Sequence, residues 1–289
     1  MTTAPPSLFT NNARLSSMLS DDTVAVIGAG NIGHALIGGM VGGGLIEAEN
    51  VIATRRTASA LDAMAEEFPG LRTTTDNVEA VQDASVILLT IKPQGRAEVI
   101  TNIRDHVDRE VLVISVLAGI TSERLQLGFG QDQPVIRAMP NTPALVDAGA
   151  TALAPGTYAT DAHLEKARAI FEAVGDAVVV PEDHMDAVTG LSGSGPAYVY
   201  MFIEALTDAG VKQGMSRTDA STLARQTVYG AAKLAIDTDK HPAILRDEVT
   251  TPGGTAIAAV SSLEEHGLRT MLINAVGTAT QRSKELNDE

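Results

Sequence analysis

The chain has 289 residues, a formal net charge of −15 and no cysteine. Without thiols it has no disulfide and no thiolate to act as a nucleophile or metal ligand. Nucleic acids and anionic membranes bind basic surfaces, so this net charge argues against both as partners. The length is sufficient for two folded units. With 44% hydrophobic and only 3% aromatic residues, the core is expected to consist of Ala, Val, Leu and Ile.

The sequence predicts three parts: a flexible tail over residues 1–20, an α/β domain over residues 21–181 and a helical domain over residues 182–289. The tail has no apolar stretch flanked by basic residues, so we do not expect a signal peptide. No apolar run approaches the length of a membrane-spanning helix. Together with the lack of cysteine, these features favour a cytoplasmic protein.

From residue 23 to about residue 180, short apolar segments alternate with amphipathic helical patterns. This alternation is typical of a doubly wound, mostly parallel sheet. Several segments are apolar at every position, which indicates burial on both faces. We expect the later strands to add an antiparallel edge. The predicted strands are Val24–Gly28, Val51–Thr54, Leu71–Thr74, Val86–Ile91, Val111–Val116, Val135–Met139, Ala150–Ala154 and Ala177–Val180.

The first strand runs directly into a glycine fingerprint, Gly28-Ala29-Gly30-Asn31-Ile32-Gly33. Gly28 permits a tight turn, Gly30 lets a pyrophosphate approach the backbone, and Gly33 lets the following helix lie close to the strand. The free N–H groups at the helix start, those of Asn31 and Ile32 included, then face the phosphates. Because the motif follows a strand and opens a helix, it favours a Rossmann dinucleotide site over a structural glycine turn.

The second strand indicates which dinucleotide binds. NAD-binding domains place an acid about 20 residues after the glycines to hold the ribose 2′-hydroxyl. Here the strand ends in Thr54-Arg55-Arg56, without an acid. Guanidinium groups suit a 2′-phosphate, and Thr54 adds a hydroxyl, so the sequence favours NADPH, with NADH as an alternative. Arg55 and Arg56 as ordinary solvated surface residues are the competing interpretation.

Other candidates for the cofactor crevice follow later strands, at the edge where parallel strands end. Asn77 precedes a helical segment and is expected to cap it and reach the adenosine side. The stretch Arg137–Pro143 ends the sixth strand in a rigid loop that is flanked by prolines and carries an amide and a hydroxyl. Ordinary loop chemistry is the alternative for each of these. The remaining candidates are Thr90, Lys92 and Pro93 after the fourth strand and Met139 and Asn141 after the sixth.

After Pro181 the chain contains helical patterns over Asp183–Gly214, Thr218–Asp237, Gly253–His266 and Leu268–Lys284. Several of these helices are nearly apolar along much of their length and therefore need to be buried. About 100 residues of helix cannot bury so much apolar surface alone. We therefore predict an all-α dimerisation domain and a homodimer or a higher multiple of dimers.

The stretch from Thr189 to Tyr198 is unusual for a helix because it contains three glycines and Pro196. Each glycine costs about 0.5–1 kcal/mol relative to alanine. Pro196 lacks an N–H and leaves the Ser192 carbonyl without its helical partner. One interpretation is close packing of two helices. The other is a space for a nicotinamide ring and substrate, with hydroxyls from Thr189 and Ser194.

A second unusual stretch runs from Thr251 to Thr255. Thr251 is a good N-cap, Pro252 suits the first helical position, and Gly267 is the expected stop after His266. Two glycines, Gly253 and Gly254, leave the N–H groups of the first turn bare. Such a helix start binds a carboxylate or a phosphate. A well-capped helix without a ligand is the alternative.

These residues resemble the pyrroline-5-carboxylate reductase family from Val24 to about Ser283. The most specific similarity is in Arg137–Pro143, Gly190–Tyr198 and above all Leu245–Val260. The resemblance implies a Rossmann domain, an interlocking helical dimerisation domain, and reduction of 1-pyrroline-5-carboxylate to L-proline with NADPH or NADH, the last step of proline biosynthesis.

The resemblance also implies roles for individual residues. It places Thr189 near the imine nitrogen. It assigns the substrate carboxylate to Thr251, Gly253, Gly254 and Thr255. The family often has a hydroxyl residue two places after the paired glycines, where this chain has Ala256. Thr255 or backbone N–H groups are then expected to make that contact.

Two other functions are compatible with the sequence. A 3-hydroxyacid dehydrogenase usually needs a lysine on the first long helix after the sheet domain, and here none occurs between Thr189 and Lys212. A non-catalytic NADP-binding scaffold is the alternative from another class. The six histidines are scattered without metal-ligand spacing, so we expect neither a metal site nor a catalytic histidine.

Overall fold

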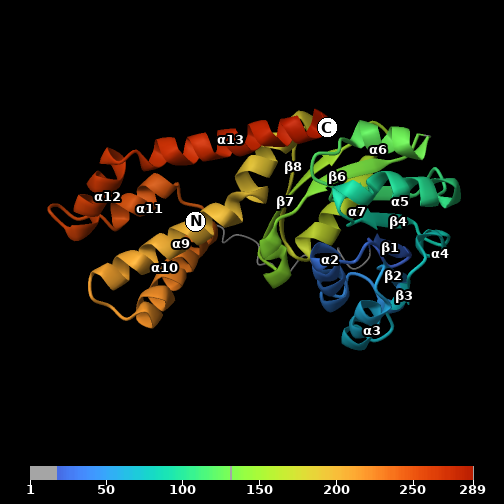
Figure 1. Cartoon of the computed structure of the whole chain (residues 1–289), viewed down its shortest axis with the longest axis horizontal. Coiled ribbons are helices and arrows are strands. Elements are labelled where there is room, and N and C mark those ends of the chain that lie inside the picture. The colour runs from blue at the N-terminus through green and yellow to red at the C-terminus, as the bar shows by residue number, and fades with distance from the viewer. Residues whose placement is uncertain (1–17, 131, 289) are drawn as a thin grey trace, which may run out of the picture. The chain divides into compact units, whose positions relative to one another are not determined.

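The computed structural model describes residues 18–130 and 132–288. The chain forms two compact units (Figure 1). The first contains the residues up to Gly193 and those from Ala279 on, and the second contains Ser194–Thr278. The domain limits predicted from the sequence, after residues 20 and 181, stay predictions.

Within the described residues, the first unit contains one sheet in the order β3-β2-β1-β4-β5-β6-β7-β8. The strands from β1 to β6 pair in parallel, β7 is antiparallel to β6, and β8 is parallel to β7. The predicted α/β class, the mostly parallel sheet and the antiparallel edge are confirmed. The strands are β1 (Val24–Ile27), β2 (Val51–Thr54), β3 (Arg72–Thr74), β4 (Val86–Leu89), β5 (Leu112–Ser115), β6 (Val135–Met139), β7 (Gly149–Pro155) and β8 (Gly175–Val179).

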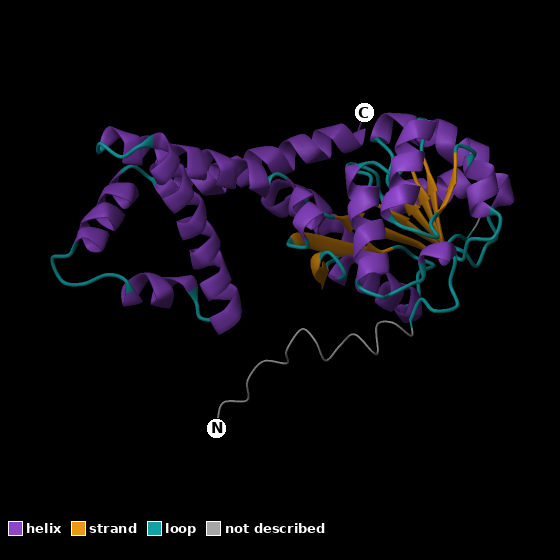
Figure 2. Ribbon diagram, turned by 90° about the horizontal axis from the view of Figure 1, so that it is seen from below, coloured by secondary structure: helices purple, strands orange, loops and turns teal. Residues whose placement is uncertain are grey.

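Helices cover both faces of the sheet (Figure 2). Along β1, Val24 and Val26 lie in one apolar cluster and Ala25 and Ile27 in the other, one on each side. A strand buried on both faces is apolar at every position, which explains the continuous runs in the sequence. The main helices of the α/β layer are α2 (Asn31–Gly42), α3 (Ala58–Glu67), α4 (Asn77–Val81), α5 (Arg96–Ile103), α6 (Ser122–Phe129) and α7 (Asp161–Glu172).

The start of the described chain is packed against the first unit. Leu19 is fully buried in the same cluster as Val24, and Met18 packs against that cluster. The Asp22 N–H also donates to the Leu19 carbonyl at 3.1 Å. The expectation of a loose tail up to residue 20 is therefore wrong for Leu19, because its buried side chain anchors the segment. Residues 1–17 lie outside the described residues.

The chain leaves the sheet through η6 (Glu182–His184) and α8 (Met185–Val188), and then forms the π-helix η7 (Thr189–Gly193). The helical pattern predicted over Asp183–Gly214 is present, but its middle, Thr189–Gly193, is a π-helix between two α-helices. Glycines weaken a helix and Pro196 lacks an N–H, so the regular hydrogen-bond ladder breaks here. Short π-helical segments frequently occur at functional sites.

The second unit is helical throughout its regular structure. Its α9 (Gly195–Lys212), α10 (Arg217–Thr238) and α12 (Thr255–Glu265) lie close to the predicted segments, and α13 (Leu268–Asp288) continues into the first unit. The sequence analysis missed α11 (Pro242–Glu248), a short helix that His241 caps by accepting from the Ala243 N–H at 3.2 Å. Throughout the described part of the chain, every helix is too short or too polar to cross a membrane.

A capping box begins α7. Thr160 Oγ1 accepts from the His163 N–H at 3.3 Å, and His163 Nδ1 accepts from the Thr160 N–H at 3.2 Å. Burial lowers the pKa of His163 from its ordinary 6.5, and the nearby Lys166 charge lowers this pKa further. A protonated Nδ1 no longer accepts a hydrogen bond, so protonation opens the box.

We predict that His163 makes part of the stability depend on pH. Its pKa is lower in the folded chain than the unfolded value of 6.5, so its stabilising contribution is present above that pH and is lost as the pH falls below it. His163→Gln keeps a capping acceptor and removes the titration. Urea unfolding at about pH 7.5 and about pH 5.5 measures the difference. Wild type should lose more stability than the variant, and equal losses would contradict the prediction.

Candidate active site

The glycine turn between β1 and α2 has the shape that the fingerprint requires. Gly28 has φ +82°, and a Cβ there would lie 2.4 Å from the Cγ2 atom of Ile91. A Cβ on Gly33 would lie 2.8 Å from Thr90 Oγ1 and 3.1 Å from Val26 Cγ1. Gly30 differs, since the nearest described atom to its Cβ position is a carbonyl oxygen 3.8 Å away. A side chain is therefore excluded at Gly28 and Gly33, whereas Gly30 has room for one.

Two threonine hydroxyls hold this turn. Thr54 Oγ1 accepts from the Gly28 N–H at 3.1 Å and donates to Asn77 Oδ1 at 2.7 Å. Thr90 Oγ1 lies 3.1 Å from the carbonyl oxygens of Ile27 and Gly28. We expected Thr54 to offer its hydroxyl to a phosphate, but the side chain is only 1% exposed and its hydroxyl is used inside the protein. The structure gives Thr54 and Thr90 the task of positioning the turn.

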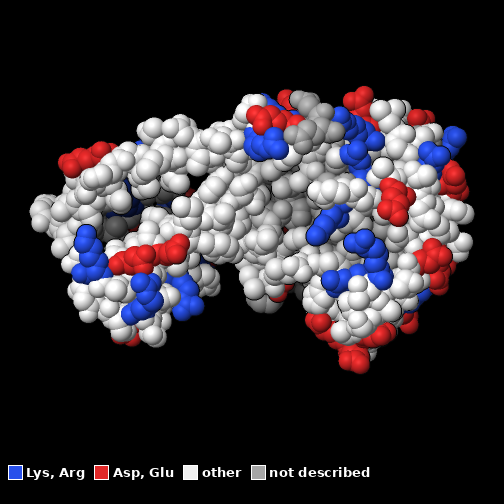
Figure 3. Space-filling view, in the orientation of Figure 1, with Lys and Arg blue, Asp and Glu red and all other residues white. Residues whose placement is uncertain are grey.

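The start of α2 fits an anionic ligand. Its N-cap, Gly30, provides no side chain to accept from the first N–H groups, and no acid lies in the first turn. Asn31 is exposed and Ile32 half-buried. Bare N–H groups at the positive end of a helix dipole bind phosphate. Figure 3 shows Lys and Arg side chains on the face of the first unit over α2 and β1, although the chain is acidic overall.

The residues after β2 stay available on the surface. Arg55 and Arg56 are exposed, and within the described residues neither makes an ion pair that would neutralise it. Asn77 is half-buried through its bond to Thr54. We expected Asn77 to cap α4, and this was wrong: Asp76 is the N-cap and accepts from the Val78 N–H at 2.8 Å. Asn77 is the first helical residue instead.

The segment after β4 turns away through η3 (Pro93–Gly95). The Gly95 N–H donates to the Lys92 carbonyl at 3.0 Å, and the Lys92 side chain is exposed. Lys92 thus presents its ammonium group to solvent at the same sheet edge as the glycine turn. The backbone of Pro93 begins the turn.

The π-helix η7 begins with Thr189, one of the two hydroxyl residues predicted for the catalytic site. Thr189 Oγ1 donates to the Met185 carbonyl at 2.9 Å, and Ser192 Oγ donates to the Val188 carbonyl at 3.2 Å. Ser194 is the N-cap residue of α9 and makes no side-chain capping bond among the described residues. Since Thr189 donates to the backbone, its oxygen keeps lone pairs that accept from a ligand.

Strand β6 contacts this π-helix. Asn141 Nδ2 donates to the Ser192 carbonyl at 3.1 Å, and Asn141 Oδ1 accepts from the Ala150 N–H at 2.9 Å. This is the carbonyl that Pro196 leaves without a helical partner. A Cβ on Gly193 would lie 2.7 Å from Met139 Cε. The side chains of Met139 and Asn141 therefore support the π-helix and are not free.

The sequence analysis did not assign a role to two residues that lie near the π-helix segment. Arg137 of β6 is 2% exposed, and its Nη1 donates to Glu182 Oε1 at 2.9 Å. Among the described residues, Arg137 Nη2 and Glu182 Oε2 are buried without a hydrogen-bond partner. The sequence contained one signal for this buried pair: an arginine inside an otherwise apolar strand. Leaving such groups unpaired costs about 1–3 kcal/mol each.

The Thr251–Thr255 stretch differs from the sequence prediction. Gly254, not Thr251, is the N-cap of α12, and the helix begins at Thr255. Pro252 and Gly253, with φ +68° at Gly253, form a turn closed by a 2.9 Å bond from the Gly254 N–H to the Thr251 carbonyl. Pro followed by a positive-φ glycine is the pattern of a type II turn. The paired glycines thus precede the helix, and its first N–H groups remain bare of a side-chain cap.

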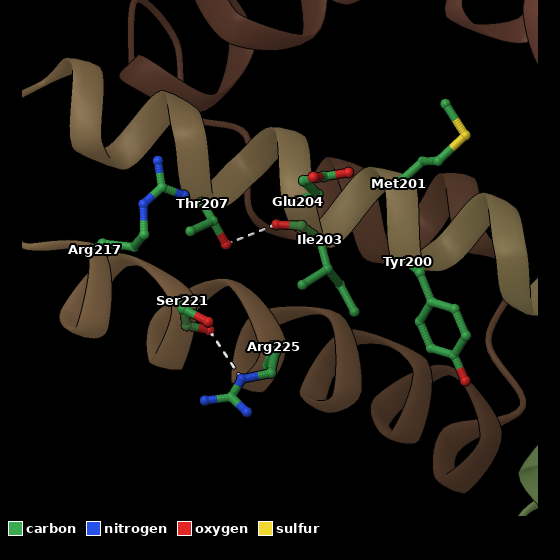
Figure 4. A pocket seen from close by; sticks show the side chains of 8 residues that line it. All are labelled: Tyr200, Met201, Ile203, Glu204, Thr207, Arg217, Ser221 and Arg225. Atoms are coloured by element: carbon green, nitrogen blue, oxygen red, sulfur yellow. Dashed lines mark hydrogen bonds between the residues drawn. The ribbon is translucent and has the colours of Figure 1, made fainter.

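The second unit also has an open groove of about 530 Å³ between α9 and α10 (Figure 4). Arg217 at its end pairs with Asp208 at 2.9 Å, and Thr207 donates to its own helix. These polar groups are engaged within the unit, so the groove does not assemble a reactive site. Its lining consists of Tyr200, Met201, Ile203, Glu204, Thr207, Arg217, Ser221 and Arg225. Among the described residues, no group of three or more His, Asp or Glu side chains is placed to hold a metal ion.

The strand order and the glycine turn define a dinucleotide-binding domain of the Rossmann class. Family models agree: "NADP oxidoreductase coenzyme F420-dependent" matches residues 23–119, and "Pyrroline-5-carboxylate reductase dimerisation" matches residues 182–286. The pyrroline-5-carboxylate reductase of Methanosarcina acetivorans is 43% identical over 93% of this chain and 99% of its own. This chain belongs to the pyrroline-5-carboxylate reductase family.

Solved structures of the family have the same fold. The enzyme from Coxiella burnetii superimposes with a TM-score of 0.88 at 35% identity, over 92% of this chain and 98% of that one. The Plasmodium falciparum enzyme, determined with NADP bound, gives a TM-score of 0.81 at 29% identity, over 93% and 99% of the two chains. The resemblance stated from the sequence is confirmed.

We predict that two neighbouring glycines respond differently to alanine. Gly28→Ala forces a left-handed residue and a clash with Ile91, and should cost about 1–3 kcal/mol of stability. Gly30→Ala meets open space, so stability should change by less than about 0.5 kcal/mol. The added methyl group instead occupies the path of the pyrophosphate. Thermal unfolding and NADPH fluorescence titration measure both, and unchanged NADPH affinity in Gly30→Ala would contradict the assignment.

Proposed function

We propose that this chain reduces 1-pyrroline-5-carboxylate to L-proline with NADPH as hydride donor. One observation carries the proposal: the glycine turn after β1 and the π-helix with Thr189 lie at the same edge of the sheet. The turn follows the carboxyl end of β1, and Met139 and Asn141 at the carboxyl end of β6 hold the π-helix. Membership of the reductase family supports this assignment.

The first unit binds the cofactor. The N–H groups of Asn31, Ile32 and Gly33 hold the pyrophosphate beside Gly28 and Gly30, because no side chain competes for them. Arg55 and Arg56 contact the 2′-phosphate, and Asn77 lies towards the adenosine. Thr90, Lys92, Pro93, Met139 and Asn141 border the nicotinamide half. When bound, the cofactor supplies a hydride for the imine carbon.

Thr189 orients the substrate nitrogen. A cyclic imine binds already protonated, so the site needs no strong general acid. The Thr189 hydroxyl donates to the Met185 carbonyl and keeps its lone pairs for the N–H of the imine. Ser194, four residues before Tyr198 and at the start of α9, offers a second hydroxyl. These residues orient the ring, and orientation alone lowers the barrier considerably.

The second unit anchors the substrate carboxylate. The bare N–H groups at the start of α12 attract an anion, and no acid lies in the first turn of that helix. Thr251 and Thr255 are exposed and contribute hydroxyls. Gly253 and Gly254 form the turn that keeps the approach open. Ala256 adds no hydroxyl, so Thr255 and the backbone make this contact.

The direct test mixes the purified chain, NADPH and 1-pyrroline-5-carboxylate, and follows NADPH absorbance and proline formation. Stoichiometric oxidation of NADPH with proline as product is expected. Family membership favours this activity over a 3-hydroxyacid dehydrogenase. NADP-dependent oxidation of a 3-hydroxy acid without imine reduction would support that enzyme, and NADPH binding without turnover of either substrate would support a scaffold.

The second unit also forms a homodimer in this proposal. Its helices bury almost nothing within one chain: Thr207 is the one buried residue of α9, and α12 has none. The family model for these residues is a dimerisation model. Light scattering of the full chain at micromolar concentration should give a dimer or a multiple of dimers, whereas a monomer would contradict this. Apolar side chains exposed in one chain include Val199, Tyr200, Met201, Phe202, Leu223, Tyr229, Ile236, Met271, Leu272 and Ile273.

We also propose that the protein acts in the cytoplasm. The lack of cysteine fits a reducing compartment. Cell fractionation tests this, and recovery of the protein outside the cytoplasmic fraction would contradict it.

We predict that Arg55→Ala combined with Arg56→Ala weakens NADPH binding and spares NADH. Each lost charge-assisted contact to the 2′-phosphate costs about 1.5–3 kcal/mol. Both side chains are exposed, so the fold should be unaffected. Michaelis constants for the two cofactors measure the effect. Equal losses for NADPH and NADH would assign these arginines another role.

We further predict that Gly254→Ala raises the Michaelis constant for the substrate and leaves NADPH binding unchanged. The new Cβ would lie 2.3 Å from Thr251 Oγ1, so this hydroxyl must move. Gly42→Ala is the matched control, because nothing lies within 4 Å of its Cβ position. Substrate titration and NADPH fluorescence separate the two sites. Loss of NADPH binding in Gly254→Ala would assign the turn to the cofactor.

A further inference from the structure

Residues of β6 and of the loop after it contact both ends of the segment 182–193, which carries Thr189. Alternate residues of a strand point to the same side. Arg137 and Met139 follow this spacing in β6, and Asn141 continues it two residues after the strand ends. Each of the three contacts the chain between residues 182 and 193. Arg137 bonds Glu182 at the start of the segment. Met139 and Asn141 contact Gly193 and Ser192 at its end.

The contact at the start of the segment is an ion pair between Arg137 and Glu182, in which the arginine is buried. The side chain of Arg137 is 3% exposed and that of Glu182 is 29% exposed. Glu182 Oε1 also lies 3.4 Å from the Ser122 N–H, so the carboxylate is fixed between β6 and the start of α6. The Ser283 hydroxyl donates to Asp186 Oδ1 at 2.7 Å, which ties the next turn of the segment to α13.

The pair is poorly suited to a purely stabilising role. Within the described residues, Arg137 Nη2 and Glu182 Oε2 are buried and unpartnered, so the pair makes one hydrogen bond where a bidentate pair makes two. Apolar residues of similar volume frequently stabilise a core at least as well as a buried ion pair. A charged pair fixes direction as well as distance, which apolar contacts do not.

We propose that Arg137 is a positioning residue for hydride transfer: through Glu182 it fixes the segment that carries Thr189. This inference rests on the proposed function, since Thr189 is assigned there to the substrate nitrogen. Arg137 sets the start of the segment and Asn141 sets its end, and Thr189 lies between these two points. Small displacements of Thr189 then change the alignment of the imine with the hydride donor.

The experiment compares Arg137→Met, Glu182→Gln and the double variant Arg137→Met/Glu182→Leu with wild type. All rates are measured well below each unfolding temperature. We expect kcat to fall about 10- to 100-fold in Arg137→Met, because misplacement near 1 Å has effects of this size. The Kd for NADPH should stay within about twofold, because the glycine turn is not touched. Glu182→Gln keeps an acceptor oxygen and should show a smaller loss of kcat.

Two readouts separate positioning from structure. With NADPH deuterated at the transferred hydrogen, the isotope effect on kcat should rise in Arg137→Met, because hydride transfer becomes the slow step. The double variant removes both charges and should lose about as much kcat as Arg137→Met alone, since the pair acts as a unit. Recovery of wild-type kcat in the double variant would overturn the proposal.

Asp22→Asn is the matched control. It weakens another buried ion pair of the first unit, in which Lys166 Nζ lies 2.6 Å from Asp22 Oδ2. It should lower the unfolding temperature and leave kcat and the isotope effect unchanged. If Arg137→Met behaves like Asp22→Asn, Arg137 is structural and the inference fails. If wild type itself does not reduce the imine, the proposed function fails, and the two failures are thereby distinguished.

Discussion

The proposed cofactor site depends on the hydrogen bonds between two threonines and the β1–α2 turn: Thr54 accepts from the Gly28 N–H, and Thr90 donates to the turn carbonyls. Thr54 ends β2 and Thr90 directly follows β4. Both strands pair in parallel with β1, so the sheet register brings the two hydroxyls to the turn. This turn leaves no room for side chains at Gly28 and Gly33. What remains open is Gly30 and the bare start of α2. The proposed site thus uses the one glycine of the turn at which a Cβ position is not crowded.

An acidic protein that binds anions must control where its acids lie. The helices α2 and α12, at which we place the pyrophosphate and the substrate carboxylate, have no acid in the first turn and no side-chain cap. The same is true of α3, which follows Arg55 and Arg56. Three of the helices that are assigned no ligand differ. Glu123 opens α6, Asp161 opens α7 and Asp219 opens α10, each behind a side-chain cap. Acids at these positions stabilise the helix dipole, whereas the bare ends keep the dipole for a ligand.

The elements with a strong local signal were predictable from the sequence. The strands β1, β2, β4 and β5 are buried at every position, and their nearly continuous apolar runs located them close to their bounds. The edge strands β3 and β8 are partly exposed, and the alternation of strand and helix segments indicated them instead. The helix starts were less predictable. Pro252 suits the first position of a helix and also the second position of a turn, and the positive φ of Gly253 decides for the turn. The burial of Thr54 and the Arg137–Glu182 pair depend on contacts between distant segments, which local patterns do not contain.

In the π-helix, a hydrogen bond that the local sequence cannot make is replaced by a contact with a distant residue. Pro196 removes the donor that a regular helix would offer to the Ser192 carbonyl, and the sequence alone indicates this vacancy. The structure fills it with Asn141, whose other amide atom is held by the Ala150 N–H of β7. A helix completed by its own backbone needs no external support, whereas this one takes part of its hydrogen bonding from the sheet. The position of Thr189 is consequently set by β7 and the residue Asn141 after β6, whereas the glycine turn is set by residues of β2 and after β4. All these strands belong to one sheet, which therefore positions both parts of the proposed reaction centre.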